Sequence, residues 1–99
     1  MGANEPRFHP EALAEYAAAF RWYQERSSRA ATRFELETER VLDQIIASPE
    51  VFPKYDEQHR FALLHRFPYS VVYQVHETRV YIIAVAHASR LPGYWQDRT

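Results

Sequence analysis

Three consecutive runs of β-forming residues dominate the second half of the chain. Val, Ile, Tyr and Phe are concentrated in residues 61–67, 69–76 and 79–87, and each run has about the length of a strand. Pro68 cannot donate a backbone hydrogen bond and marks the first bend, whereas Glu77-Thr78 suits a short hairpin turn. The pattern predicts three strands in an antiparallel meander.

Two amphipathic helices are predicted before these strands. Pro10 suits a first helical position, with His9 just outside the helix, and Ser27-Ser28 offers hydroxyl caps between the two helices. A short first edge strand is expected at Phe8, and a loop at 49–58. Apolar residues recur at helical spacing in two stripes, which are Leu13, Tyr16, Ala17, Phe20 and Tyr23, and then Ala31, Phe34, Thr38, Val41, Leu42 and Ile45.

These elements predict an α+β fold, an N-terminal helical hairpin packed on a small antiparallel β-sheet in the order β-α-α-β-β-β, with residues 1–99 as a single domain. The runs 69–75 and 80–85 are apolar in both alternating phases, which is typical of strands covered on both faces. One helical hairpin covers only one face. We therefore expect the C-terminal segment Leu91–Trp95, or a partner chain, on the other.

Composition excludes several classes of protein. The sequence has no cysteine, which rules out disulfides, thiol nucleophiles and thiolate metal sites and is compatible with a reducing cytoplasm. It also has no stretch of about 20 apolar residues and no basic, apolar start typical of a signal peptide. A cytoplasmic protein is expected. The net charge of −1 argues against strong non-specific binding to nucleic acid.

One set of polar residues near the strand ends suggests chemistry. Cleavage of RNA by its own 2′-hydroxyl needs a general base, a general acid and cations around the phosphate, and His, Tyr and Arg can fill these roles. The same set could instead grip an acidic peptide, or be exposed arginines beside a half-buried histidine. The histidine spacing predicts no metal site, and no cofactor is expected. The set comprises Arg60, Arg66, His87, Arg90 and Tyr94.

The order and spacing of several motifs resemble the RelE/ParE superfamily of toxins from bacterial toxin–antitoxin modules. The resemblance implies a small α+β fold and an antitoxin whose acidic or amphipathic C-terminal segment wraps the toxin. It is carried by Phe67-Pro68-Tyr69 with Tyr73, by His87 with Arg90 and Trp95, by Arg60, and by Ala47-Ser48-Pro49 at the end of the helical hairpin.

Departures from the RelE pattern favour the ParE-like branch. RelE-like members cut messenger RNA on the ribosome and usually carry an arginine three positions before the tyrosine that matches Tyr73, where this sequence has Ser70. The stretch 87–90 keeps one arginine, and Lys54 is the one lysine of the preceding loop. ParE-like toxins are described as targeting DNA gyrase and need no catalytic residues.

The resemblance thus implies the toxin of a type II, plasmid-stabilisation module that a cognate antitoxin neutralises and that acts on DNA gyrase. Two alternatives stay open. One is a ribosome-dependent mRNA endonuclease that uses Arg66, His87, Arg90 and Tyr94, and the other is an inactive interaction domain of the same fold.

The apolar strands also predict where a partner lies. A contiguous apolar sheet face flanked by arginines should attract an amphipathic, acidic segment of the antitoxin. The residues expected to bind the antitoxin or the target are Arg60, Leu64, Arg66, Arg90, Tyr94 and Trp95.

Overall fold

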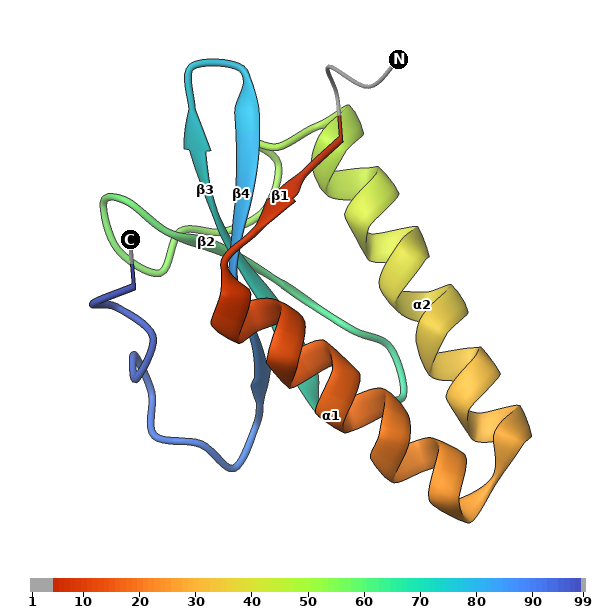
Figure 1. The fold of residues 1–99 in the computed structure, drawn as a ribbon. Helices are drawn as coiled ribbons and strands as arrows, with labels where there is room; N and C mark the ends of the chain where they lie inside the picture. Colours follow the sequence, from red (N-terminus) through yellow and green to blue (C-terminus); the bar gives the residue numbers. More distant parts are fainter. Residues whose placement is uncertain (1–4, 99) are drawn as a thin grey trace.

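The computed structural model describes residues 5–98 and shows two helices and a four-stranded sheet (Figure 1). The order β-α-α-β-β-β confirms the predicted α+β fold. The elements are β1 (Arg7–Phe8), α1 (Pro10–Arg26), α2 (Ser28–Ala47), β2 (Arg60–Leu63), β3 (Tyr69–His76) and β4 (Arg79–His87).

A single residue, Ser27, connects the two helices. Its backbone N–H donates to the carbonyl of Tyr23 and so ends α1, while its hydroxyl accepts from the N–H of Ala30 at 3.1 Å and caps α2. At the other end of α1, His9 is the N-cap, and its Nδ1 accepts from the N–H of Glu11. These caps fix the tight helical hairpin that the sequence predicts.

The sheet has the strand order β1-β4-β3-β2. β2, β3 and β4 are antiparallel, as predicted, and the expected edge strand at Phe8 is confirmed. That strand, β1, pairs with β4 in the parallel sense, because the helices and the β2–β3 hairpin intervene between the two. The predicted Glu77-Thr78 turn joins β3 to β4, with Glu77 at a φ of 58°.

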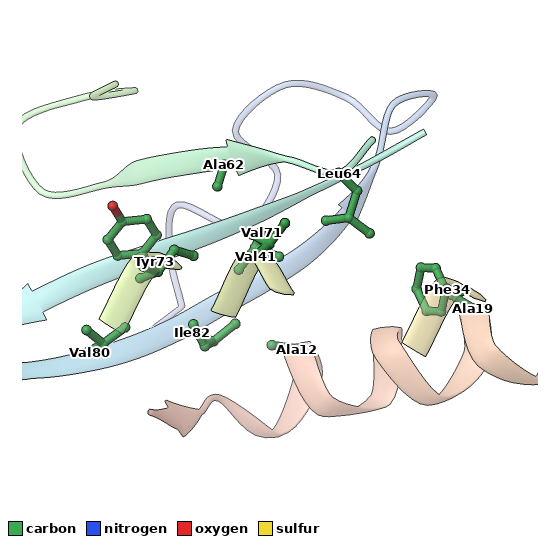
Figure 2. Close-up of a cluster of buried hydrophobic side chains, with 11 residues drawn as sticks. Ala12, Ala19, Phe34, Val41, Ala62, Leu64, Val71, Tyr73, Val80 and Ile82 are labelled. Atoms are coloured by element: carbon green, nitrogen blue, oxygen red, sulfur yellow. The ribbon is translucent and has the colours of Figure 1, made fainter. Parts of the chain in front are cut away.

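The main core lies between the helical hairpin and the sheet. Phe34, Val41 and Ile45 of α2 are fully buried, as the predicted stripe requires. Figure 2 shows the side chains of Val71, Tyr73 and Ile82 in the same cluster. The predicted stripe of α1 is confirmed at Tyr16, Phe20 and Tyr23, which pack against this core. Its first residue is wrong, because Leu13 is 55% exposed and the neighbouring Ala12 is buried instead.

The C-terminal segment covers the second face of the sheet. Of the two covers predicted for this face, the segment Leu91–Trp95 and a partner chain, the described residues 5–98 show the first. Trp95 is 3% exposed and packs with Val72, Ile83 and Ala84. In Figure 1 this segment lies on the opposite side of the sheet from α2. Both faces of β3 and β4 are therefore buried by this chain itself.

β2 is shorter than the predicted strand 61–67. It ends at Leu63, and residues 65–67 form a turn in which Arg66 has a φ of 70°. Leu63 is 64% exposed, whereas Leu64 is 6% exposed and belongs to the core beneath the helices. Ala62 and Leu64 thus form the inner face of β2 and of the residue that follows it.

None of the described helices is long and apolar enough to cross a membrane.

Candidate functional site

A groove of about 460 Å³ lies between α1 and the segment that follows β4. Ala18 and Trp22 of α1 form one side, and Arg90 and Tyr94 form the other. Tyr69, at the start of β3, also lines it. The groove is mostly apolar, with a few polar groups converging on it, which is the usual character of a binding site.

The structure brings three of the candidate residues together here. His87, Arg90 and Tyr94 all line the groove, and the Arg90 guanidinium lies 3.9 Å from the centre of the Tyr94 ring. A cation over an aromatic face is attracted by the ring quadrupole, so this contact holds Arg90 at the rim. Trp22 lines the same groove, is 51% exposed and carries Arg26 over its ring at 3.7 Å.

Arg60 and Arg66 lie elsewhere. Arg60 donates from Nη1 to the carbonyls of Glu50 and Phe52, at 3.2 and 2.6 Å, and so fixes the loop between α2 and β2. Arg66 lines a separate groove beside α2. The proposed ribonuclease set is therefore not assembled, since Arg66 is not part of the groove that holds His87, Arg90 and Tyr94.

Glu15 organises the polar end of the groove, a role that no sequence pattern indicates. Its carboxylate accepts the Tyr94 hydroxyl at 2.7 Å, the Val85 backbone N–H at 3.0 Å and both terminal nitrogens of Arg98. Burial alone would raise the pKa of Glu15, but the hydrogen bonds from Arg98, Tyr94 and Val85 outweigh it and lower the pKa. Glu15 is thus a fixed, charged acceptor in the fold.

This network determines what Tyr94 can do. Burial, followed by the neighbouring Glu15 carboxylate, raises the pKa of Tyr94 to about 12. The hydroxyl stays protonated at neutral pH, and its proton is donated to Glu15. A general acid or base needs its proton directed at the substrate and a pKa near the working pH, so Tyr94 is poorly suited to either role.

His87 is also held by its surroundings. Its Nδ1 accepts from the Ser89 backbone N–H at 3.0 Å and lies 2.8 Å from the Ser89 hydroxyl, while its ring packs edge-on against Tyr69. An accepting Nδ1 carries no proton, so the ring N–H is on Nε2. His87 therefore offers a hydrogen-bond donor at the groove.

Two residues expected to bind a partner are buried within the fold. Leu64 is 6% exposed beneath the helices, and Trp95 is 3% exposed between the sheet and the rings of Tyr55 and His59. They were predicted to bind a partner because they are large and hydrophobic, but each is buried in the core of the protein itself. The expectation that the apolar sheet face is open to a partner is wrong, because the segment around Trp95 occupies it.

Within residues 5–98, no group of three or more His, Asp or Glu side chains is arranged to hold a metal ion.

The fold defines a class, a small α+β protein whose helical hairpin covers one sheet face and whose own C-terminal segment covers the other. A solved structure described as the chromosomal ParDE toxin–antitoxin system from P. aeruginosa has a similar fold, with a TM-score of 0.60. The match covers 86% of this chain and 96% of that one at 15% sequence identity, which shows the fold alone. Comparison with curated proteins gave no match.

Residues 7–92 match the family model described as the ParE toxin of the type II toxin–antitoxin system parDE. The chain therefore belongs to the ParE toxin family. This confirms both the resemblance to the RelE/ParE superfamily and the choice of its ParE-like branch.

Proposed function

We propose that this protein, the toxin of a type II toxin–antitoxin module, acts in the cytoplasm by binding DNA gyrase and is held inactive by a cognate antitoxin. Family membership supports the toxin role and implies an antitoxin partner. Gyrase is the target described for ParE-like toxins. A toxin that binds its target needs an exposed, rigid contact surface and no proton transfer.

The single observation that carries this proposal is the Tyr94–Glu15 hydrogen bond of 2.7 Å. Tyr94, the phenol of the endonuclease alternative, donates its proton within the fold, and its pKa is raised to about 12. General acid–base catalysis contributes about 10² to 10⁴ in rate, so an RNA-cleaving toxin depends on groups that are free to transfer protons.

The groove beside α1 is the proposed target-binding surface. Trp22 and Arg90 are exposed there, and Trp and Arg are the residue types most often dominant in protein–protein interfaces. Trp22 keeps half of its surface exposed beside an apolar groove, which costs solubility unless a partner covers it.

Inducible expression in cells tests the proposal. We expect growth arrest on induction and restored growth when the antitoxin, encoded by an adjoining reading frame, is co-expressed. His87→Ala removes a half-buried side chain of the groove and no required proton transfer, so it should weaken the arrest by no more than a few-fold. Trp22→Ala should weaken the arrest strongly, whereas Leu13→Ala, which truncates an equally exposed side chain of α1 outside the groove, should not.

Growth unaffected by induction of the soluble wild-type chain would contradict the toxin role. Loss of arrest in His87→Ala, together with loss of messenger RNA cleavage, would instead support the endonuclease alternative.

A further inference from the structure

A third groove, of about 510 Å³, lies along the edge strand β1 and is called the β1 groove below. It is lined by residues 7–10, by His76 at the end of β3, and by Tyr81 and Ile83 of β4. Tyr81 and Ile83 belong to the second face of the sheet, and Figure 1 shows β1 beside β4. The β1 groove shares no lining residue with the groove beside α1. A ligand bound in it therefore leaves the proposed target-binding surface uncovered.

The β1 groove has a cation and no carboxylate among its lining residues. The cation is Arg7, which is exposed and forms no ion pair within residues 5–98. Two carboxylates close to it in sequence, Glu11 and Glu77, do not line the groove, and Glu11 is paired with Arg98 at 3.4 Å. A guanidinium is planar and donates in a fork that fits phosphate or carboxylate oxygens. The charge of the groove therefore favours an anion.

A second hydrogen-bond donor lies beside Arg7. His9 follows two positions later on extended backbone, with a ψ of 141°, so the side chains of Arg7 and His9 lie on the same side of the chain. His9 Nδ1 accepts the N–H of Glu11 at 3.1 Å, so the neutral ring carries its proton on Nε2. The chain before α1 thus presents a guanidinium and a ring N–H to one anionic group.

His76 is held in place by a chain of hydrogen bonds that begins at a buried residue. His59, which is 3% exposed, donates from Nδ1 to Asp56 at 2.8 Å and accepts at Nε2 from the Gln74 amide at 2.9 Å. The carbonyl oxygen of the same Gln74 amide accepts from His76 Nε2 at 2.7 Å. Because this carbonyl fixes the proton of His76 on Nε2, Nδ1 of the neutral ring is an acceptor. An exposed histidine on a hairpin is thereby kept in one orientation.

Aromatic rings supply most of the apolar surface of the β1 groove. The His76 ring lies edge-on to the Tyr81 ring, with 5.1 Å between the ring centres. Phe8 and Tyr81 are both half-buried, so part of each ring remains accessible in the groove. Nucleobases stack on aromatic side chains of this kind, and an amino group on the base is a donor for an accepting imidazole nitrogen.

We propose that the β1 groove binds a free nucleoside monophosphate whose base carries an amino group. Arg7 and His9 hold the phosphate, the base packs against Tyr81, and its amino group donates to His76 Nδ1. The volume of the groove lies in the range of small-molecule sites. A sugar phosphate would leave the rings uncovered and a nucleoside would leave Arg7 without an anion, so tight binding needs both halves of the nucleotide.

Titration of the full-length protein with adenosine 5′-monophosphate (AMP), followed by ¹H–¹⁵N NMR, tests the site. We expect shifts at the residues that line the β1 groove and none at the Trp22 indole N–H in the groove beside α1. Adenosine and ribose 5-phosphate each keep one half of the ligand, and each should bind about tenfold more weakly than AMP. A 5′-phosphorylated oligonucleotide distinguishes a nucleic-acid end from a free nucleotide. It should bind no more tightly than AMP, because Arg7 is the one arginine in the lining.

Two variants test the location. Arg7→Gln removes the cation at an exposed position and should weaken AMP binding about tenfold, while leaving the weak binding of adenosine unchanged. His76→Ala removes an exposed ring with its acceptor and should weaken AMP binding about fivefold. Arg21→Gln makes the same change as Arg7→Gln at an exposed arginine of α1 outside the groove, and it should bind AMP within about twofold of wild type. Thermal unfolding by circular dichroism checks that each variant is folded.

Several results would overturn the proposal. These are the absence of shifts at millimolar AMP, shifts centred on Trp22, and binding of adenosine or ribose 5-phosphate as tight as that of AMP. Tighter binding of the oligonucleotide than of AMP, or wild-type affinity in both folded variants, would also overturn it. The growth assay of the proposed function fails independently, because the NMR titration does not depend on toxicity.

Discussion

Glu15 on α1 and Arg98 near the end of the chain form a two-point ion pair, with Arg98 Nη1 3.0 Å from Oε1 and Arg98 Nη2 2.8 Å from Oε2. The same Arg98 Nη1 donates to the carbonyl of Ile83, and the same carboxylate accepts the N–H of Val85. The pair thus satisfies the Ile83 carbonyl and the Val85 N–H of β4, which β1 does not reach, and it links the C-terminal segment to α1.

Removing one member of this pair should destabilise the protein substantially. Glu15→Ala removes the main carboxylate partner of a guanidinium with 10% exposure and the acceptor of the Val85 N–H, which we expect to cost about 3 kcal/mol of unfolding free energy. Urea denaturation measures this. Glu25→Ala removes the exposed partner of Arg26 and should change stability by less than about 0.5 kcal/mol. Equal effects would show that the Glu15 pair is not structural.

Stability should fall on acidification because of Glu37. Hydrogen bonds from the Arg40 guanidinium lower the pKa of Glu37 most. Burial opposes this effect and the His65 N–H adds to it, so that the pKa falls from 4.5 to about 2. A carboxyl whose pKa is lower in the folded than in the unfolded protein stabilises the folded state at pH values above the unfolded pKa. This contribution is lost as pH falls from about 4.5 towards 2.

Glu37→Gln tests this pH dependence. The variant should be less stable than wild type at pH 7, by about 1 to 3 kcal/mol, and the difference should shrink as pH approaches 2. Thermal unfolding followed across pH 2.5 to 7 makes the comparison. A difference that is constant over this range would contradict the assignment.

The same substitution should destabilise the protein far more at Leu64 than at Leu63. Leu64→Asp places a carboxylate in the core beneath the helices and should cost more than about 3 kcal/mol, a large fraction of the stability of a small domain. Leu63→Asp changes a side chain that is 64% exposed and should cost less than about 1 kcal/mol. Urea denaturation followed by circular dichroism compares the two variants, and a Leu64→Asp variant as stable as Leu63→Asp would contradict the inner position of Leu64.

The turn between β3 and β4 offers a stabilising substitution. Glu77 has a φ of 58°, where a side chain is strained and glycine is not, so Glu77→Gly should raise the unfolding free energy by about 0.5 to 1 kcal/mol. Thr78→Gly, at the neighbouring position without a positive φ, should lower it. A higher melting temperature for the second variant than for the first would contradict this reading of the turn.

Local patterns in the sequence were enough to predict most of the fold. The stripe of α2, the caps at His9 and Ser27 and the turn at Glu77-Thr78 each depend on residues close together in the chain. These interactions are set by helical spacing and turn chemistry, which neighbouring residues determine. The superfamily likewise followed from the run of short motifs and the ParE-like branch from departures such as Ser70, and the family match confirms both.

The polar contacts of the site could not be predicted in this way. Glu15 meets Arg98 across 83 positions of sequence, and on α1 it looks like any other solvated glutamate. The strand predicted at 61–67 was too long because it included Arg66, whose left-handed φ belongs to the turn that follows β2. Long-range pairings and backbone turns of this kind leave no periodic signal.

Supercoiling of relaxed plasmid DNA by purified gyrase tests the central claim most directly. We predict that the wild-type protein inhibits the reaction in a dose-dependent way, that His87→Ala inhibits it within a few-fold of wild type, and that Trp22→Ala inhibits it weakly. Unimpaired supercoiling at a large excess of folded protein, with cleavage of messenger RNA on ribosomes under matched conditions, would contradict the account.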